Sequence, residues 1–168
     1  MPNYLKLEAL MIRRLATFCG AGFALFLFAF ALASPATADS DRIINKDSED
    51  VAIRGYDTVA YFTDNRAVQG KPEFEYMWQD ARWWFVNAEH RDLFAADPER
   101  YAPRFGGFCT GAMSLGLARF ANPENWSIID GKLYMNMTKR GRDNLRANPD
   151  STIQKAEETW ARRGFGHQ

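Results

Sequence analysis

EFEYMWQDARWWFVNAEHRDLF, residues 73–94, decides the fold of this chain. Polar and apolar residues alternate from residue 73 to 78, which predicts a strand, and residues 82–86 predict a second one. The intervening Gln79-Asp80-Ala81 reads as a turn, so the two strands form a β-hairpin. Asn87 is a good helix N-cap, so a helix follows directly. The stretch predicts a hairpin that leads into a helix.

Turn and capping signals extend this pattern in both directions. Upstream, Asp57 in GYDTVAYF is placed to cap a short helix over TVAYF. Downstream, Asp97-Pro98 starts another helical turn, because proline is tolerated at the first helical position. Asp130-Gly131 is a hairpin turn between two further strand patterns, residues 126–129 and 132–137. These signals predict short elements throughout.

The C-terminal part of the chain is expected to be helical. CTGAMSLGLARF, residues 109–120, has a helical pattern weakened by Gly111 and Gly116. Residues 138–149 read as a connection that contains a helix. From residue 151 to 160, apolar side chains share one helical face, so this helix should dock on the domain. No internal repeat is evident. The predicted fold is a small α+β domain over residues 51–163, with antiparallel hairpins packed against short helices.

The N-terminus has the pattern of an export signal over residues 1–38. Basic residues precede an uncharged run from Leu15 to Ala33, and Ala36-Thr37-Ala38 is a small-x-small cleavage pattern. The alternative is a retained membrane anchor, because about 18 apolar residues can span a bilayer. Both alternatives place the rest of the chain in the periplasm or outside the cell. Residues 39–50 are polar and are expected to form a flexible leader.

The charge balance argues against nucleic-acid binding. The chain has 21 Lys+Arg and 21 Asp+Glu. Removing Lys6, Arg13, Arg14 and Glu8 with the signal leaves 18 basic and 20 acidic residues. A net charge of −2 gives no basic surface for a nucleic acid. A membrane partner is expected only through an uncleaved N-terminus.

Four motifs in this order resemble the YHS-domain family, in its exported single-domain branch. They are GYDTVAYF (55–62), WWFVNAEHRDLF (83–94), DPERYAPRFGGFC (97–109) and WSIIDGKLYMN (126–136). The resemblance implies a small α+β domain in which a hairpin feeds a helix, as in treble-clef-like metal modules. Some members are taken to bind heavy metals through cysteines. In this chain the corresponding positions are Val86, His90 and a residue near 58–60, so that cysteine set is absent.

Cys109 is the only thiol expected to remain after export, because Cys19 lies in the apolar run. Unpaired cysteines are unusual in exported proteins. At the start of a helix its thiolate form is favoured, and a thiolate binds metals. The alternative is a small apolar residue buried in the core.

Three methionines and one histidine are candidate partners for Cys109. Met113 lies four residues further on, where a continuous helix places it on the same face. Met135 and Met137 are two apart on a predicted strand, so they share a face. Thioether sulfur suits Cu(I), although packing in the core is the commoner role of methionines at such spacings. His90 occupies a family cysteine position, but it is also an ordinary helix-surface residue.

These residues lead to three hypotheses. The first is a non-enzymatic copper-binding module, anchored by Cys109, that exchanges metal with a copper-handling or other envelope protein. The second is a metal-free interaction or small-ligand-binding domain with Cys109 in its core. The third is a thiol-dependent redox protein. The third lacks a second cysteine and a paired base.

Overall fold

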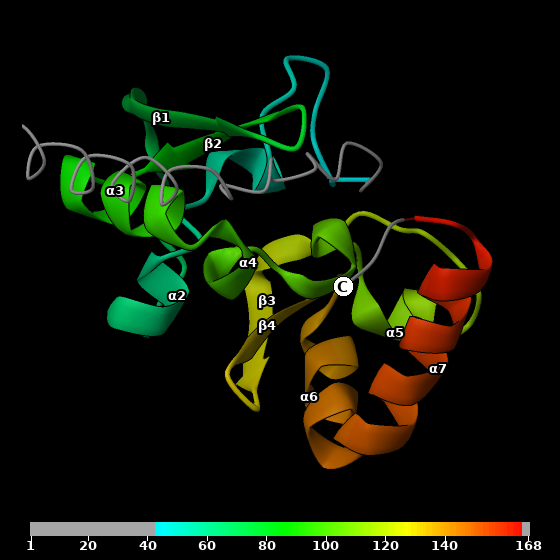
Figure 1. Ribbon diagram of the computed structural model, residues 1–168. Helices are drawn as coiled ribbons and strands as arrows, with labels where there is room; N and C mark the ends of the chain where they lie inside the picture. Colours follow the sequence, from blue (N-terminus) through cyan, green and yellow to red (C-terminus); the bar gives the residue numbers. More distant parts are fainter. Residues whose placement is uncertain (1–42, 166–168) are drawn as a thin grey trace, which may run out of the picture. The chain divides into compact units, whose positions relative to one another are not determined.

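The computed structural model describes residues 43–165. The predicted export signal, the start of the leader, Cys19 and His167 lie outside these residues. The described part is a mixed α+β domain with two antiparallel hairpins and six α-helices (Figure 1). Its first half contains η1 (Ile53–Gly55), α2 (Ala60–Thr63), β1 (Lys71–Trp78), β2 (Ala81–Phe85), α3 (Ala88–Ala96) and α4 (Pro98–Tyr101). Its second half contains η2 (Arg104–Gly107), α5 (Thr110–Met113), β3 (Asn122–Ile129), β4 (Lys132–Asn136), α6 (Lys139–Ala147) and α7 (Pro149–Arg162).

The predicted capping residues start the helices. Asn87 accepts a hydrogen bond from the backbone N–H of His90, and Asp97 accepts from Arg100. Thr138 plays the same part for α6, where it accepts from Gly141. Each side-chain oxygen satisfies an N–H that has no partner within the helix. The prediction of hairpins packed with short helices is therefore confirmed.

The two halves are an internal structural repeat, so the expectation of no repeat is wrong. The strands and the following helix of the first half recur 51 residues later with the same lengths, as α3 starting at Ala88 and α6 starting at Lys139 show. The hairpin registers also correspond, since Lys71 pairs with Phe85 and Asn122 pairs with Asn136. Each first strand has its irregularity at the same place. The domain is thus two copies of one hairpin–helix unit.

The segment before each hairpin also repeats, with one residue fewer between it and the hairpin in the second half. GYDTVAY, residues 55–61, corresponds to GFCTGAM, residues 107–113, at a spacing of 52. Gly55 and Gly107 both have a positive φ, of 75° and 80°. The side chain of Asp57 accepts from the backbone N–H of Ala60, and that of Cys109 accepts in the same way from Ala112. Cys109 is therefore the structural counterpart of Asp57.

Two hydrophobic clusters hold the domain together. The first contains the aromatic side chains of β2 and α3, and Cys109 and Met135 also belong to it. The second lies under α5, α6 and α7 and includes Tyr134 and Trp160. Strand β4 is buried on both faces, since Met135 packs in the first cluster and Tyr134 in the second. Side chains alternate along a strand, so β4 connects the clusters.

The packed domain begins before the predicted boundary at Val51. Ile44 and Asn45 are buried, and the backbone N–H of Asn45 donates to the carbonyl of Gly106. A Cβ on Gly106 would lie 1.9 Å from the Ile43 carbonyl oxygen, so only glycine allows this approach. Residues 43–50 are therefore part of the fold rather than a flexible leader.

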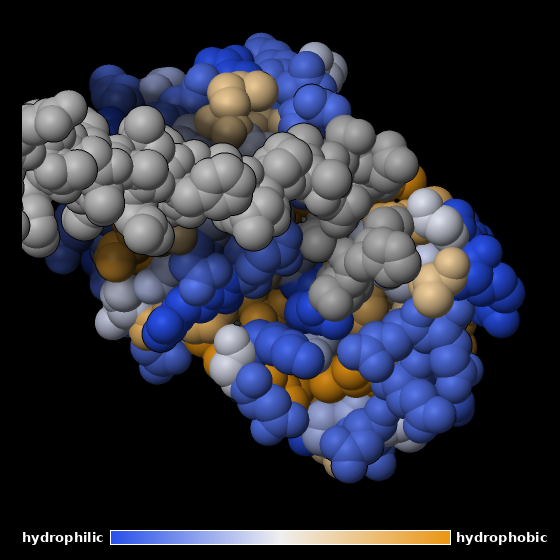
Figure 2. Space-filling model, in the orientation of Figure 1, coloured by the Kyte–Doolittle hydropathy of each residue, from blue (hydrophilic) through white to orange (hydrophobic). Residues whose placement is uncertain are grey.

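The predicted docking of the last helix is confirmed. Ala156 and Trp160 of α7 are buried in the second cluster, and Trp160 lies 5.9 Å from Phe105 between ring centroids. In the view of Figure 2, the surface over α6 and α7 is mainly hydrophilic, as expected for amphipathic helices. Within residues 43–165, no helix has the length and apolar character needed to cross a membrane.

Candidate functional site

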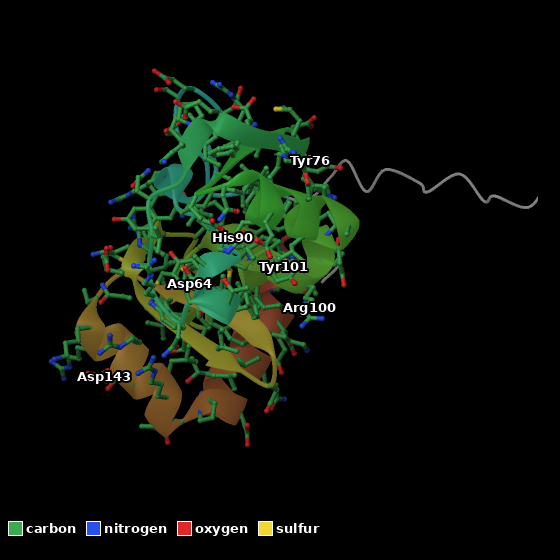
Figure 3. The ribbon with its side chains drawn as sticks, turned by 90° about the vertical axis from the view of Figure 1, so that its left-hand side faces the viewer. Asp64, Tyr76, His90, Arg100, Tyr101 and Asp143 are labelled. Atoms are coloured by element: carbon green, nitrogen blue, oxygen red, sulfur yellow. The ribbon has the colours of Figure 1, made fainter. Side chains whose placement is uncertain are left out.

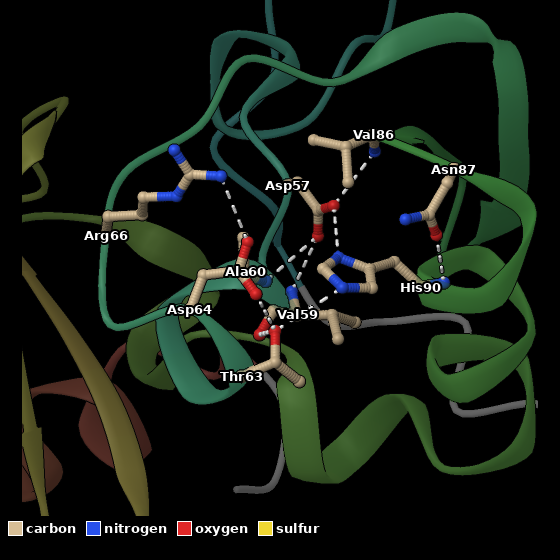
Figure 4. Close-up of polar contacts among 9 residues, drawn as sticks. All are labelled: Asp57, Val59, Ala60, Thr63, Asp64, Arg66, Val86, Asn87 and His90. Carbon is tan, nitrogen blue, oxygen red and sulfur yellow. Dashed lines mark hydrogen bonds and ion pairs between the residues drawn. The ribbon is translucent and has the colours of Figure 1, made fainter.

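A buried carboxylate joins three elements of the first half (Figure 4). Asp57 is fully buried, and its Oδ1 accepts from the backbone N–H groups of Val59 (2.9 Å) and Ala60 (3.2 Å). Its Oδ2 accepts from the Val86 N–H at 2.9 Å and lies 2.7 Å from His90 Nδ1. Asp57 thus connects the start of α2, the end of β2 and the first turn of α3. We had expected it only as a helix cap.

His90 is oriented by this carboxylate. With Nδ1–H donating to Asp57, its Nε2 faces the Thr63 hydroxyl at 3.4 Å. Asp64 lies beside them, and a hydrogen bond from the Thr63 hydroxyl lowers the pKa of its carboxyl. Figure 3 shows His90 and Asp64 near one another, with Asp143 of α6 well away from them. A carboxylate-oriented imidazole resembles a metal ligand with its outer partner. Asp57, however, already holds four hydrogen bonds, which suits a structural centre.

Cys109 lies next to Met135. The two residues form an isolated parallel β-bridge, and both side chains pack in the first hydrophobic cluster. The Thr110 hydroxyl holds the two segments together by donating to the Met135 carbonyl at 3.2 Å. Cys109 is 4% exposed, and its Sγ accepts from the Ala112 N–H at 3.5 Å. The structure therefore pairs the backbones of two residues that the sequence offers as sulfur ligands.

Met113 does not accompany them, and its side chain packs in the second cluster. The helical spacing from Cys109 fails for a physical reason. Helix α5 is only four residues long, and Cys109 is its N-cap, with an extended backbone at φ −63° and ψ 116°. The rule that residues i and i+4 share a face holds only inside a helix.

The remaining two candidates lie elsewhere. Met137 follows the end of β4 and is 46% exposed, whereas Met135 is fully buried. His90 is held in the first half by Asp57 and Thr63. Within the described residues, no group of three or more His, Cys, Asp and Glu side chains is arranged to hold a metal ion.

The repeat relates the Asp57 centre to a different set of residues in the second half. Cys109 stands in the place of Asp57, Met137 in that of Val86, and Gly141 in that of His90. The second half thus has a thiol where the first has a carboxylate, and no side chain where the first has an imidazole. The similar GYDT and GFCT motifs were the available signal for this relation.

Tyr61, in the same GYDTVAYF motif as Asp57, should make the free energy of unfolding depend on pH in the alkaline range. Its ring is fully buried and its hydroxyl donates to the Pro123 carbonyl at 3.0 Å. Burial raises the pKa of this phenol well above its usual value. Only the unfolded chain then releases this proton near pH 10, so the stabilising contribution holds below that pH and falls above it.

We therefore expect Tyr61→Phe to lower stability at neutral pH by about 1 kcal/mol, through the lost hydrogen bond. Above about pH 10 the decline of stability with pH should become shallower by about 1.4 kcal/mol per pH unit. Urea unfolding between pH 7 and 11 measures both effects. An unchanged slope would show that Tyr61 ionises in the folded protein.

No family model, curated protein or solved structure matches the chain.

Proposed function

We propose that this chain is an exported, non-enzymatic binding module of the YHS type that holds one copper(I) ion between Cys109 and Met135. The observation that supports the proposal is the β-bridge between these residues, which pairs the backbone of a thiol residue with that of a thioether residue. Soft sulfur ligands of this kind select Cu(I). The hairpin–helix units are compatible with a treble-clef-like domain.

Binding at this pair requires one local rearrangement. The Cys109 thiol must lose its proton and its hydrogen bond from Ala112, and the sulfur then bonds to the metal. Helix α5 is a single turn, so opening it disturbs few backbone hydrogen bonds. Release to an envelope copper-handling protein would proceed by ligand exchange, as the incoming donor replaces one sulfur. The predicted signal over residues 1–38 supports a periplasmic or secreted location, or a membrane-anchored one if it is retained.

A second candidate function is a metal-free interaction or small-ligand-binding domain in which Cys109 is a core residue. The burial of Cys109 and its N-cap hydrogen bond favour this alternative. The two functions differ in one respect that can be measured, since only the first requires metal affinity that depends on Cys109.

Copper(I) titration of the purified protein under reducing conditions tests the proposal. A chromogenic chelator competes for the metal and reports the affinity. We expect one copper ion per wild-type chain and loss of this binding in Cys109→Ser. Serine is a good N-cap, so the variant should fold. Equal copper binding by both proteins would refute the proposal and favour the second candidate.

A further inference from the structure

Asn136 is a polar residue at a position where the first half of the repeat has a hydrophobic residue. Its counterpart in the first half is Phe85, which packs against Phe94 with ring centroids 5.1 Å apart. Asn136 is also fully buried. Among the described residues, neither its Oδ1 nor its Nδ2 has a hydrogen-bond partner. A buried carboxamide without partners is costly, so its presence calls for an explanation.

The carboxamide faces a space between two helix starts. A Cβ built on Gly111 of α5 or on Gly141 of α6 would lie 3.9 Å from Asn136 Oδ1. Nothing else lies within 4 Å of the position at Gly111. The counterparts of these glycines are Val59 and His90, so the first half carries a side chain at both positions. We call the space bounded by Asn136, Gly111 and Gly141 the Asn136 notch. Both glycines are partly exposed, so the notch lies at the edge of the buried core, with the Asn136 carboxamide on its inner side.

The charges around the notch are positive. Helix α6 has nine residues, and its first turn contains Lys139 and Arg140 but no acidic residue. Basic side chains are unfavourable at a helix start, because the helix dipole is positive there. The counterpart helix α3 follows the usual pattern, with Glu89 in its first turn. Anions bind at helix N-termini, because the free backbone N–H groups there donate hydrogen bonds to them. Basic side chains nearby add electrostatic attraction.

The repeat also shows which group is missing. In the first half the carboxylate of Asp57 accepts from the Val86 N–H and from His90. In the second half the counterpart of Asp57 is Cys109, which carries no carboxylate oxygen. We propose that the Asn136 notch binds a small oxyanion, either free phosphate or sulfate or the carboxylate or phosphate group of a larger ligand. The Asn136 amide and the backbone N–H groups of Lys139 and Arg140 donate to the anion, while the N–H of Gly141 stays with Thr138 and the two basic side chains attract the ligand.

This site uses other side chains than the proposed copper pair. Asn136 follows Met135 on β4, and successive strand side chains point to opposite faces. The copper pair packs in the first hydrophobic cluster, whereas the notch lies between α5 and α6. Cys109→Ser should therefore abolish copper binding and leave anion binding unchanged. A substitution of Asn136 should weaken anion binding and leave copper binding unchanged.

The test is a titration of the purified protein with inorganic phosphate, sulfate and acetate, against chloride at equal ionic strength. Amide chemical shifts in ¹H–¹⁵N NMR spectra report the site and the affinity. We expect saturable shifts at the Asn136 side-chain amide and the first turn of α6. The relative affinities of phosphate, sulfate and acetate distinguish the classes of oxyanion.

Two variants remove the site in different ways. Gly111→Ala combined with Gly141→Ala places methyl groups in the notch, where contacts of 3.3 Å or more allow the protein to fold. Asn136→Leu removes the unpartnered amide, and it should raise the unfolding temperature while it abolishes the shifts. Each variant should weaken oxyanion binding by at least about tenfold, equivalent to one hydrogen bond to a charged group. Lys132→Ala, at the other end of β4, is the control for charge and should bind normally.

Three results would overturn the proposal. The first is wild-type protein that shows no oxyanion-specific shifts. The second is shifts that persist in both variants, which would place the anion elsewhere. The third is an Asn136→Leu variant that is destabilised and still binds, which would give Asn136 a purely structural role.

Discussion

Asp57→Ala is expected to lower the free energy of unfolding by about 3–5 kcal/mol, because it leaves several buried hydrogen-bond donors without an acceptor. The loss is large because one side chain satisfies three backbone N–H groups and His90 Nδ1. Removing it leaves these donors buried without partners, and each unsatisfied group is costly. The free energy of unfolding of a typical domain is only about 5–15 kcal/mol, so the variant should be close to unfolding at room temperature. Urea unfolding of both proteins measures the difference.

Cys109→Ala is the matched control, because Cys109 occupies the corresponding place in the second half. Its sulfur accepts only the weak 3.5 Å hydrogen bond from Ala112, so we expect a loss of about 1 kcal/mol. The double variant Asp57→Ala/His90→Ala should be less destabilised than the sum of the single variants, since the two residues share one interaction. Similar losses for Asp57→Ala and Cys109→Ala would contradict the central role of the carboxylate.

Phe94→Ala should be nearly as destabilising, by about 3–5 kcal/mol. Phe94 is fully buried at the centre of the aromatic cluster, with its ring centroid 5.0 Å from Trp83 and 5.7 Å from Trp78. Truncation leaves a cavity that rigid aromatic neighbours cannot fill, and it removes the anchor of α3. Thermal and urea unfolding should show the loss.

The control for Phe94 is Phe120→Ala. Phe120 is 60% exposed, and its ring stacks against that of Phe108. We expect a loss of less than about 1 kcal/mol, because surface substitutions have small effects. If Phe94→Ala and Phe120→Ala lowered the free energy of unfolding equally, the first cluster would not be the main source of stability.

Local signals in the sequence predict most elements of this fold correctly. Asn87, Asp97 and the Asp130-Gly131 turn act through neighbouring backbone groups, so their effect can be read from a few residues. The alternation of Trp83 and Phe85 likewise predicts their shared buried face, because it depends only on strand geometry.

The features that the sequence did not reveal depend on distant contacts. The repeat conserves caps, turns and spacing rather than residue types, as the pairs Asp57 and Cys109 or His90 and Gly141 show. The polar stretch before Val51 looks like a leader, but its backbone pairs with a segment around Gly106. Apart from the short GYDT and GFCT motifs, neither relation leaves a local signal.

The same limit applies to the candidate ligands. Cys109 and Met135 are 26 positions apart in the sequence and meet only because the second hairpin returns beside the start of α5. The expectation for Met113 was a local one, and it depended on a helix that turned out to be a single turn. Asn136 has no sequence signal of its own, because an asparagine at a strand end usually serves a turn.

The measurement that tests the central claim most directly is the copper(I) affinity of Met135→Leu compared with Met137→Leu. Leucine preserves the volume of methionine but has no sulfur, so both variants should fold. We predict that Met135→Leu weakens binding by at least about tenfold, or 1.4 kcal/mol, while Met137→Leu binds like the wild type. Equal affinities in the two variants would contradict a site formed by Cys109 and Met135.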